Sequence, residues 1–157
     1  MKIIGVNAAD SNGMLKSLQT GQRTELKEVG LFADGTAVRL VGNETFRLCQ
    51  KFVDDFITVS TDEMCAAIKD TFEDTRSILE PAGALALAGC KKYLAKNQMK
   101  DGVFVSVLSG ANMNFDRLRF VAERARIGDN KEALLSVVIP ETPGRYRTSR
   151  HKEESNC

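Results

Sequence analysis

Ser109 and Gly110 directly follow an apolar run and are the residues best placed to do chemistry. The run, residues 103–108, reads V-F-V-S-V-L. Its length and β-branched content predict a strand buried on both faces of a parallel sheet. Such sheets hold ligands where their strands end, so Ser109 would offer a hydroxyl there and Gly110 would let another group approach the backbone. The alternative is an ordinary strand-to-helix turn, which is a common feature.

Gly35 and Glu80 also have both a structural interpretation and a ligand-binding one. Gly35 follows Asp34 in a stretch with three glycines, residues 29–42. The pair predicts a tight turn with a positive φ, either on the surface or against a ligand. Glu80 precedes Pro81, which can occupy the first position of a buried, small-residue helix. Capping that helix is its simplest role, and shaping a ligand pocket is the alternative.

Strands and helices must position these residues. Ser60 and Glu63 predict a capping box, and the helix that they open directs apolar positions, Phe72 and Ile78 among them, towards a core. Asn114 is expected to cap the helix after the Ser109 turn, and Gly128 to end it. The remaining expected elements are strands at 2–6, 56–59 and 131–139 and helices near 11–18 and 43–53. The alternating order predicts an α/β fold with a largely parallel sheet and helices on its faces.

Composition argues against several other classes. The chain has 157 residues, 43% of them hydrophobic, and a net charge of +1, so nothing suggests a nucleic-acid or membrane partner. The four cysteines are far apart and there is one histidine, so zinc ligation is not expected. Three of the cysteines lie in helical patterns, which suits a reducing compartment. The acidic residues Asp70, Glu73 and Asp74 predict a solvated helix face rather than a cation site.

Five segments together resemble the biosynthetic threonine deaminases, which are also called threonine ammonia-lyases or threonine dehydratases. The segments are VGLFADGTAV (29–38), ETFRLCQKFVDD (44–55), FEDTRSILEPAGALALAG (72–89), LSGANMNFDRLRFVAERA (108–125) and EALLSVVIPETPG (132–144). The resemblance implies a pyridoxal 5'-phosphate (PLP) enzyme of the tryptophan-synthase-β-like fold type II. It implies a partial doubly wound sheet, because the matching stretch corresponds to the later part of the catalytic domain.

The resemblance also implies a reaction. L-threonine, or L-serine, would lose water and then ammonia, and threonine would give 2-oxobutanoate for isoleucine biosynthesis. PLP supplies the electron sink for such eliminations. A homo-oligomer of the full-length family, in the cytoplasm or a plastid stroma, is the expected setting.

Four residues carry over as cofactor-binding. Ser109 matches the family residue that faces the pyridine nitrogen, where a neutral hydroxyl suits β-elimination better than a carboxylate would. Gly110 would keep the turn thin beside the ring. Gly35 falls in the loop that passes the cofactor, and Glu80 opens the helix near it. No catalytic residue carries over, and no metal either, because Asn7 stands where some relatives have an acidic ligand.

The sequence also departs from the family pattern. It has no G-G-G run for the cofactor phosphate, and the family's Schiff-base lysine and substrate-carboxylate loop would lie upstream of Met1. We therefore expect residues 1–128 to be a catalytic-domain portion, 129–144 a stub of an ACT-like regulatory domain and 145–157 a disordered tail. Such a fragment should be inactive alone. The alternatives are a serine/threonine dehydratase or racemase of the same fold, or a non-catalytic module that docks on a full-length enzyme through an uncovered sheet edge.

Overall fold

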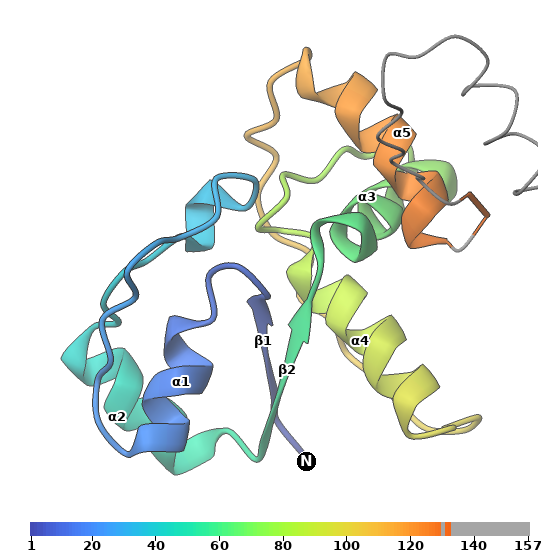
Figure 1. The fold of residues 1–157 in the computed structure, drawn as a ribbon. Coiled ribbons are helices and arrows are strands. Elements are labelled where there is room, and N and C mark those ends of the chain that lie inside the picture. The colour runs from blue at the N-terminus through green and yellow to red at the C-terminus, as the bar shows by residue number, and fades with distance from the viewer. Residues whose placement is uncertain (130, 133–157) are drawn as a thin grey trace, which may run out of the picture.

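The computed structural model describes residues 1–129 and 131–132. In chain order the elements are β1 (Ile4–Ala8), α1 (Gly13–Thr20), the 3-10 turn η1 (Asp34–Thr36), α2 (Asn43–Phe52), β2 (Asp55–Val59), α3 (Thr61–Thr75), α4 (Leu85–Lys96) and α5 (Arg117–Gly128). Figure 1 shows α1 and α2 on one side of the two strands and α3, α4 and α5 on the other.

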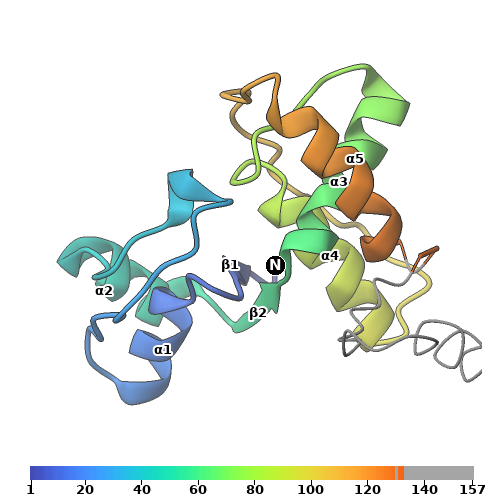
Figure 2. The ribbon, with the colours of Figure 1, turned by 45° about the horizontal axis from the view of Figure 1, so that its top comes forward.

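The described sheet has two parallel strands. Ile4 of β1 pairs with Asp55 of β2, and the register continues to Ala8 opposite Val59. Parallel strands need a crossover connection, and here α1, η1 and α2 provide it. β2 lies where the sequence predicts a strand, whereas β1 is shifted two residues later than the predicted strand at 2–6. Figure 2 shows helices on either side of the pair. The expected α/β class with parallel pairing is thus confirmed.

Helix α3 begins as its sequence predicts. The Ser60 side chain accepts a hydrogen bond from the Glu63 backbone N–H at 3.2 Å. The Glu63 carboxylate accepts one from the Ser60 N–H at 2.7 Å, which completes the capping box. The expectation that Phe72 and Ile78 face the core is wrong. Phe72 lies at the surface with the Arg76 guanidinium 5.7 Å from its ring, and Ile78 is half-buried beyond the end of the helix.

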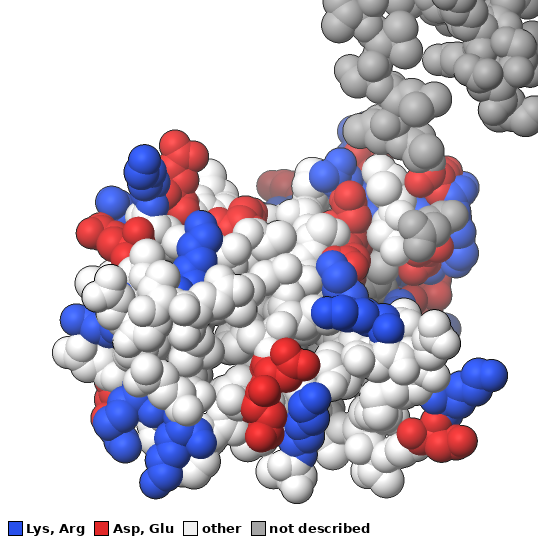
Figure 3. All heavy atoms as spheres, turned by 60° about the horizontal axis from the view of Figure 1, so that its bottom comes forward, with Lys and Arg blue, Asp and Glu red and all other residues white. Residues whose placement is uncertain are grey.

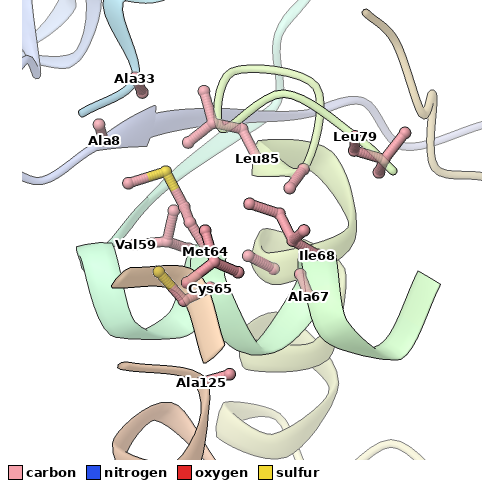
Figure 4. Close-up of a cluster of buried hydrophobic side chains, with 13 residues drawn as sticks. Ala8, Ala33, Val59, Met64, Cys65, Ala67, Ile68, Leu79, Leu85 and Ala125 are labelled. Atoms are coloured by element: carbon pink, nitrogen blue, oxygen red, sulfur yellow. The ribbon is translucent and has the colours of Figure 1, made fainter. Parts of the chain in front are cut away.

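The hydrophobic core forms around the buried face of α3. Met64, Cys65 and Ala67 are fully buried there. The cluster, shown in Figure 4, also contains Ala8, Ala33, Val59, Ile68, Leu79, Ala84, Leu85, Ala88, Val121 and Ala125. It joins both strands to α3, α4 and α5. The alanines and the close approach of Gly128 to Asp62 O let α5 pack tightly on α3, since a Cβ at Gly128 would lie 2.1 Å from that oxygen.

The predicted central strand at residues 103–108 is not formed. These residues belong to no strand or helix. Val103 is 95% exposed and Val105 is 87% exposed, whereas a strand buried on both faces was expected. A β-strand requires hydrogen bonds from a neighbouring strand, and no described strand pairs with this segment. The apolar pattern is present, but its pairing partner is not among the described residues.

Three helix boundaries also differ from the predictions. Asp116, not Asn114, precedes the first residue of α5, and Phe115 is exposed rather than packed. Gly128 is the last helical residue of α5, so it is not the cap. After Pro81 the chain makes a turn in which the Ala84 N–H donates to the Glu80 carbonyl at 3.2 Å, and α4 itself begins at Leu85.

Charged side chains of both signs are spread over the face drawn in Figure 3, with uncharged surface between them. The acidic face of α3 is partly paired, because Lys91 contacts Asp70 and Lys69 lies 3.5 Å from Glu73. Among the helices of residues 1–129, none combines the length and hydropathy that a membrane crossing requires. Most of the predicted strand at 131–139, the regulatory stub and the tail lie outside the described residues.

Candidate cofactor-binding site

The turn after residue 108 is held by Glu80. The Glu80 backbone N–H donates to the carbonyl oxygen of Gly110 at 3.2 Å. Its carboxylate accepts a hydrogen bond from the Asn112 N–H, also at 3.2 Å. Glu80 is thus joined to a residue 30 positions away by a main-chain contact and to a residue 32 positions away by a side-chain contact. Glu80 fixes the position of the Ser109–Gly110 turn relative to the start of α4.

Gly110 is required at its position for two reasons. Its φ of +74° lies in the left-handed region, which residues with a Cβ rarely adopt. A Cβ at this position would also lie 2.3 Å from the Glu80 carboxyl carbon. The close approach of Glu80 and the backbone conformation both select glycine.

Gly83 is a second position near this turn where glycine is required, and the sequence interpretation missed it. A Cβ at Gly83 would lie 1.4 Å from the carbonyl oxygen of Ser109, so only glycine allows the two backbones to meet. The Ser109 N–H points at the Gly83 carbonyl at 3.5 Å. The signal in the sequence was the small-residue triplet A-G-A after Pro81. It was interpreted as helix packing, because nothing local indicates which segment packs against it.

Gly35 joins the same neighbourhood. It lies in η1, and a Cβ built on it would lie 3.1 Å from Ala82 Cβ and 3.5 Å from a Glu80 carboxylate oxygen. The predicted positive φ is wrong. Gly35 is not among the positive-φ residues, because the chain makes a 3-10 turn in which the Asp34 carboxylate accepts from the Gly35 N–H. A hydrogen bond connects this loop to α5: the Arg117 guanidinium donates to the Phe32 carbonyl at 3.1 Å.

The four predicted residues, Ser109, Gly110, Gly35 and Glu80, are therefore brought together from three distant parts of the chain. Ser109 is exposed, and its hydroxyl makes no hydrogen bond to another described residue. That hydroxyl is free to donate to an outside acceptor. Ser109 lines none of the cavities of about 650, 530 and 260 Å³, and with the other three residues it forms a partly exposed wall.

The chemistry of this wall fits one side of a flat, neutral-to-cationic ring. The exposed Ser109 hydroxyl can bond to a ring nitrogen, and the missing side chains of Gly35 and Gly110 leave room for Ala82 and Glu80 to approach these loops. The wall does not supply a phosphate cradle or an amine. Lys69, Lys91 and Lys92 instead contact carboxylates on or near α3. Residues 1–129, 131 and 132 contain no group of metal-binding side chains.

Comparisons with known proteins show which family the chain resembles over its whole matched length. The sequence model of the family described as pyridoxal-phosphate dependent enzyme matches residues 1–110. The chain is 60% identical over 147 residues to the biosynthetic L-threonine dehydratase of Burkholderia multivorans, covering 94% of this chain and 29% of that protein. It is also 60% identical to the mitochondrial threonine dehydratase of Schizosaccharomyces pombe, covering 93% of this chain and 25% of that protein.

A solved structure shows the same similarity. The processed form of threonine deaminase isoform 2 from Solanum lycopersicum matches with a TM-score of 0.79 and 43% identity, over 81% of this chain and 35% of that chain. The chain thus spans between a quarter and a third of the length of the curated relatives described above. The family model covers more than half of the sequence, and the chain therefore belongs to the family of pyridoxal-phosphate dependent enzymes.

Proposed function

We propose that this chain is a portion of a PLP-dependent threonine ammonia-lyase that provides one wall of the cofactor site. The observation that carries the proposal is the convergence of Ser109, Gly110, Gly35 and Glu80 on one turn. We infer the substrate, L-threonine, and the reaction type from the names of the relatives. L-serine is the expected second substrate. A homo-oligomer in the cytoplasm or a plastid stroma is the expected setting of the full-length protein.

The chain's own residues would act through position and hydrogen bonding. When bound, PLP supplies an electron sink for the elimination. The Ser109 hydroxyl would donate to the pyridine nitrogen without adding a formal charge beside it. Glu80 would act as a positioning residue, since its carboxylate is engaged by the Asn112 N–H and its own N–H holds the Gly110 carbonyl. Gly35 and Gly110 would let Glu80 lie close to both loops that border the cofactor.

We expect the isolated chain to be inactive, because an amine to hold the cofactor and a phosphate cradle are missing from the wall described above. The test adds PLP and L-threonine to the purified chain and measures 2-oxobutanoate. No turnover is expected. Turnover by this chain alone would contradict the proposal that the cofactor's other contacts come from elsewhere.

A chimera tests the role of Ser109 directly. Residues 1–144 would replace the matching segment of the Burkholderia multivorans enzyme, and Ser109→Ala would be made in that background. Loss of one hydrogen bond to the ring, about 1.4 kcal/mol, predicts a decrease in kcat of roughly tenfold. Ser77→Ala, at another exposed serine, should leave kcat unchanged. Equal rates for the two variants would remove Ser109 from the site.

A racemase or serine dehydratase of the same fold is the second candidate. One observation favours considering it: the serine racemase of Dictyostelium discoideum matches with a TM-score of 0.60 at 26% identity over 73% of this chain. The same chimera discriminates. Formation of D-serine from L-serine would support the racemase, whereas 2-oxobutanoate from L-threonine supports the ammonia-lyase.

A further inference from the structure

An apolar groove of about 530 Å³ lies between β1 and residues 103–106. Ile4 and Val6 of β1 form one wall, and Val103 and Val105 form the other. Gly89, Cys90 and Tyr93 of α4 form the floor. The groove is separate from the Ser109 turn, which does not line it.

The two walls of the groove run in the same direction. Lys2, just before β1, donates to the Tyr93 hydroxyl near the end of α4 at 2.7 Å. Further along β1, Val6 lies against Gly89, where a Cβ would be 2.4 Å from a Val6 methyl. β1 therefore runs opposite to α4.

Residues 103–109 follow the same direction on the other side. Val103 lines the groove together with Tyr93 and Met99, at the end of α4. The Ser106 hydroxyl lies 3.5 Å from the Ala86 carbonyl, and the Ser109 N–H is directed at the Gly83 carbonyl, before α4 begins. This segment also runs opposite to α4, so it is parallel to β1.

Both walls carry main-chain groups that are unpaired within the part of the chain that the structure describes. β1 pairs with β2 along one edge, and its other edge faces the groove. Residues 103–108 have the composition of a strand but pair with none. Unpaired strand edges are templates for another strand. The exposure of Val103 and Val105 adds an apolar surface along the same wall.

We propose that this groove binds one extended segment of another polypeptide, which lies between the two walls and completes a parallel sheet. Adjacent strands lie about 4.8 Å apart, so a strand that pairs with both walls requires them to lie roughly 9.6 Å apart. Its side chains on the α4 face must be apolar, because Gly89, Cys90 and Val6 meet them there.

The segment comes from a part of a related enzyme that this chain does not match. The Burkholderia multivorans relative has 71% of its length outside the matched region, since the match covers 29%. A second copy of this chain is a poorer occupant. Edges related by a two-fold axis normal to the sheet pair antiparallel, whereas the two walls here are parallel and share one floor. The inference rests on family membership and extends the proposed function by naming a partner.

Overlapping 15-residue peptides that tile the unmatched part of the Burkholderia multivorans enzyme are the first probe. Each would be titrated against the full 157-residue chain, followed by hydrogen exchange. One contiguous set should bind and should slow exchange at residues 103–108 and at the β1 amides that do not donate to β2. Binding without protection of both walls would contradict the proposal, as would binding by no peptide.

Variants of the exposed wall sharpen the test. Val105→Pro removes a backbone N–H at a residue that is 87% exposed, so the isolated chain should keep its circular dichroism spectrum. It should weaken peptide binding at least tenfold. Leu31→Lys is the matched control, because Leu31 is another apolar residue, 79% exposed, that does not line the groove. Equal affinities for the two variants would refute the groove as the binding site.

Co-purification provides a second measurement. The tagged full chain would be co-expressed with the Burkholderia multivorans enzyme lacking the matched segment, and separately with the intact enzyme. We expect the truncated enzyme to be captured and the intact one to be captured far less. Capture of both to the same extent, or concentration-dependent self-association of this chain that Val105→Pro abolishes, would overturn the proposal. None of these measurements depends on catalysis, so they are independent of the proposed reaction.

Discussion

The buried face of α3 and the groove beside β1 contain similar apolar residues in opposite environments. Met64 and Cys65 of α3 are fully buried under α4 and α5, whereas Val103 and Val105 on the groove wall face solvent. The difference lies in where the hydrogen-bonding partners are. A helix satisfies its own main chain and needs only an apolar cover, but a strand needs another strand. The described chain supplies the cover for α3 and does not supply the neighbour for residues 103–108.

The same substitution at two methionines compares how much side-chain packing stabilises each region. Met64 is 0% exposed in the core and Met99 is 42% exposed at the groove. Met64→Ala should lower the free energy of unfolding by about 2–5 kcal/mol, because it leaves a cavity, and Met99→Ala by less than about 0.5 kcal/mol. Urea denaturation measures both. Similar losses would show that the groove side is packed as tightly as the core.

Gly110 and Gly21 have nearly the same φ, so an alanine substitution at each of them tests the turn that follows the exposed segment. Gly110 has φ +74° and Gly21 has φ +73°, but only Gly110 has a neighbour, Glu80, where a Cβ would lie. Gly21→Ala should cost about 1 kcal/mol from backbone strain alone. Gly110→Ala should cost roughly 1–3 kcal/mol more, because Glu80 must move. Denaturation gives both values, and equal values would mean that Glu80 does not hold the turn.

Replacing Asp129, which directly follows α5, tests how much the ion pair between α5 and α3 stabilises the buried region. Burial alone raises the pKa of Asp129, but hydrogen bonds from Lys69 and Lys131 outweigh it and hold the pKa below its ordinary value. Lys69 comes from α3, so the pair ties α5 to α3 at 3.0 Å. Asp129→Asn should cost on the order of 1 kcal/mol at neutral pH.

The pH dependence of that cost has a definite sign. A depressed carboxyl pKa contributes stability above the unfolded-state value of about 3.9, and this stability is lost as the pH falls through the folded-state pKa. The stability difference between wild type and Asp129→Asn should therefore shrink between pH 5 and pH 2. Asp74→Asn, at an exposed residue of α3, is the control and should show little change. A difference that grows towards acid would contradict the assigned pairing.

Local signals predicted the start of α3 well, but they predicted the core face of α3 and the Ser109 region only in part. The Ser60–Glu63 capping box is confirmed because both hydrogen bonds join residues three positions apart. Ser109, Gly110, Gly35 and Glu80 were selected largely by resemblance, and their shared cofactor role stays a prediction although the fold brings them together. Gly83 was missed because the need for glycine comes from Ser109, 26 positions away, and no local pattern encodes that contact.

The sequence by itself determined the two paired strands, the helix order and the start of α3, because period, capping and turn chemistry act over a few residues. The tertiary structure alone decided that residues 103–108 stay exposed and that Glu80 holds the Gly110 turn. Both outcomes depend on segments distant in the chain. A strand pattern states what a segment can pair with, and only the presence of a neighbour in space makes it a strand.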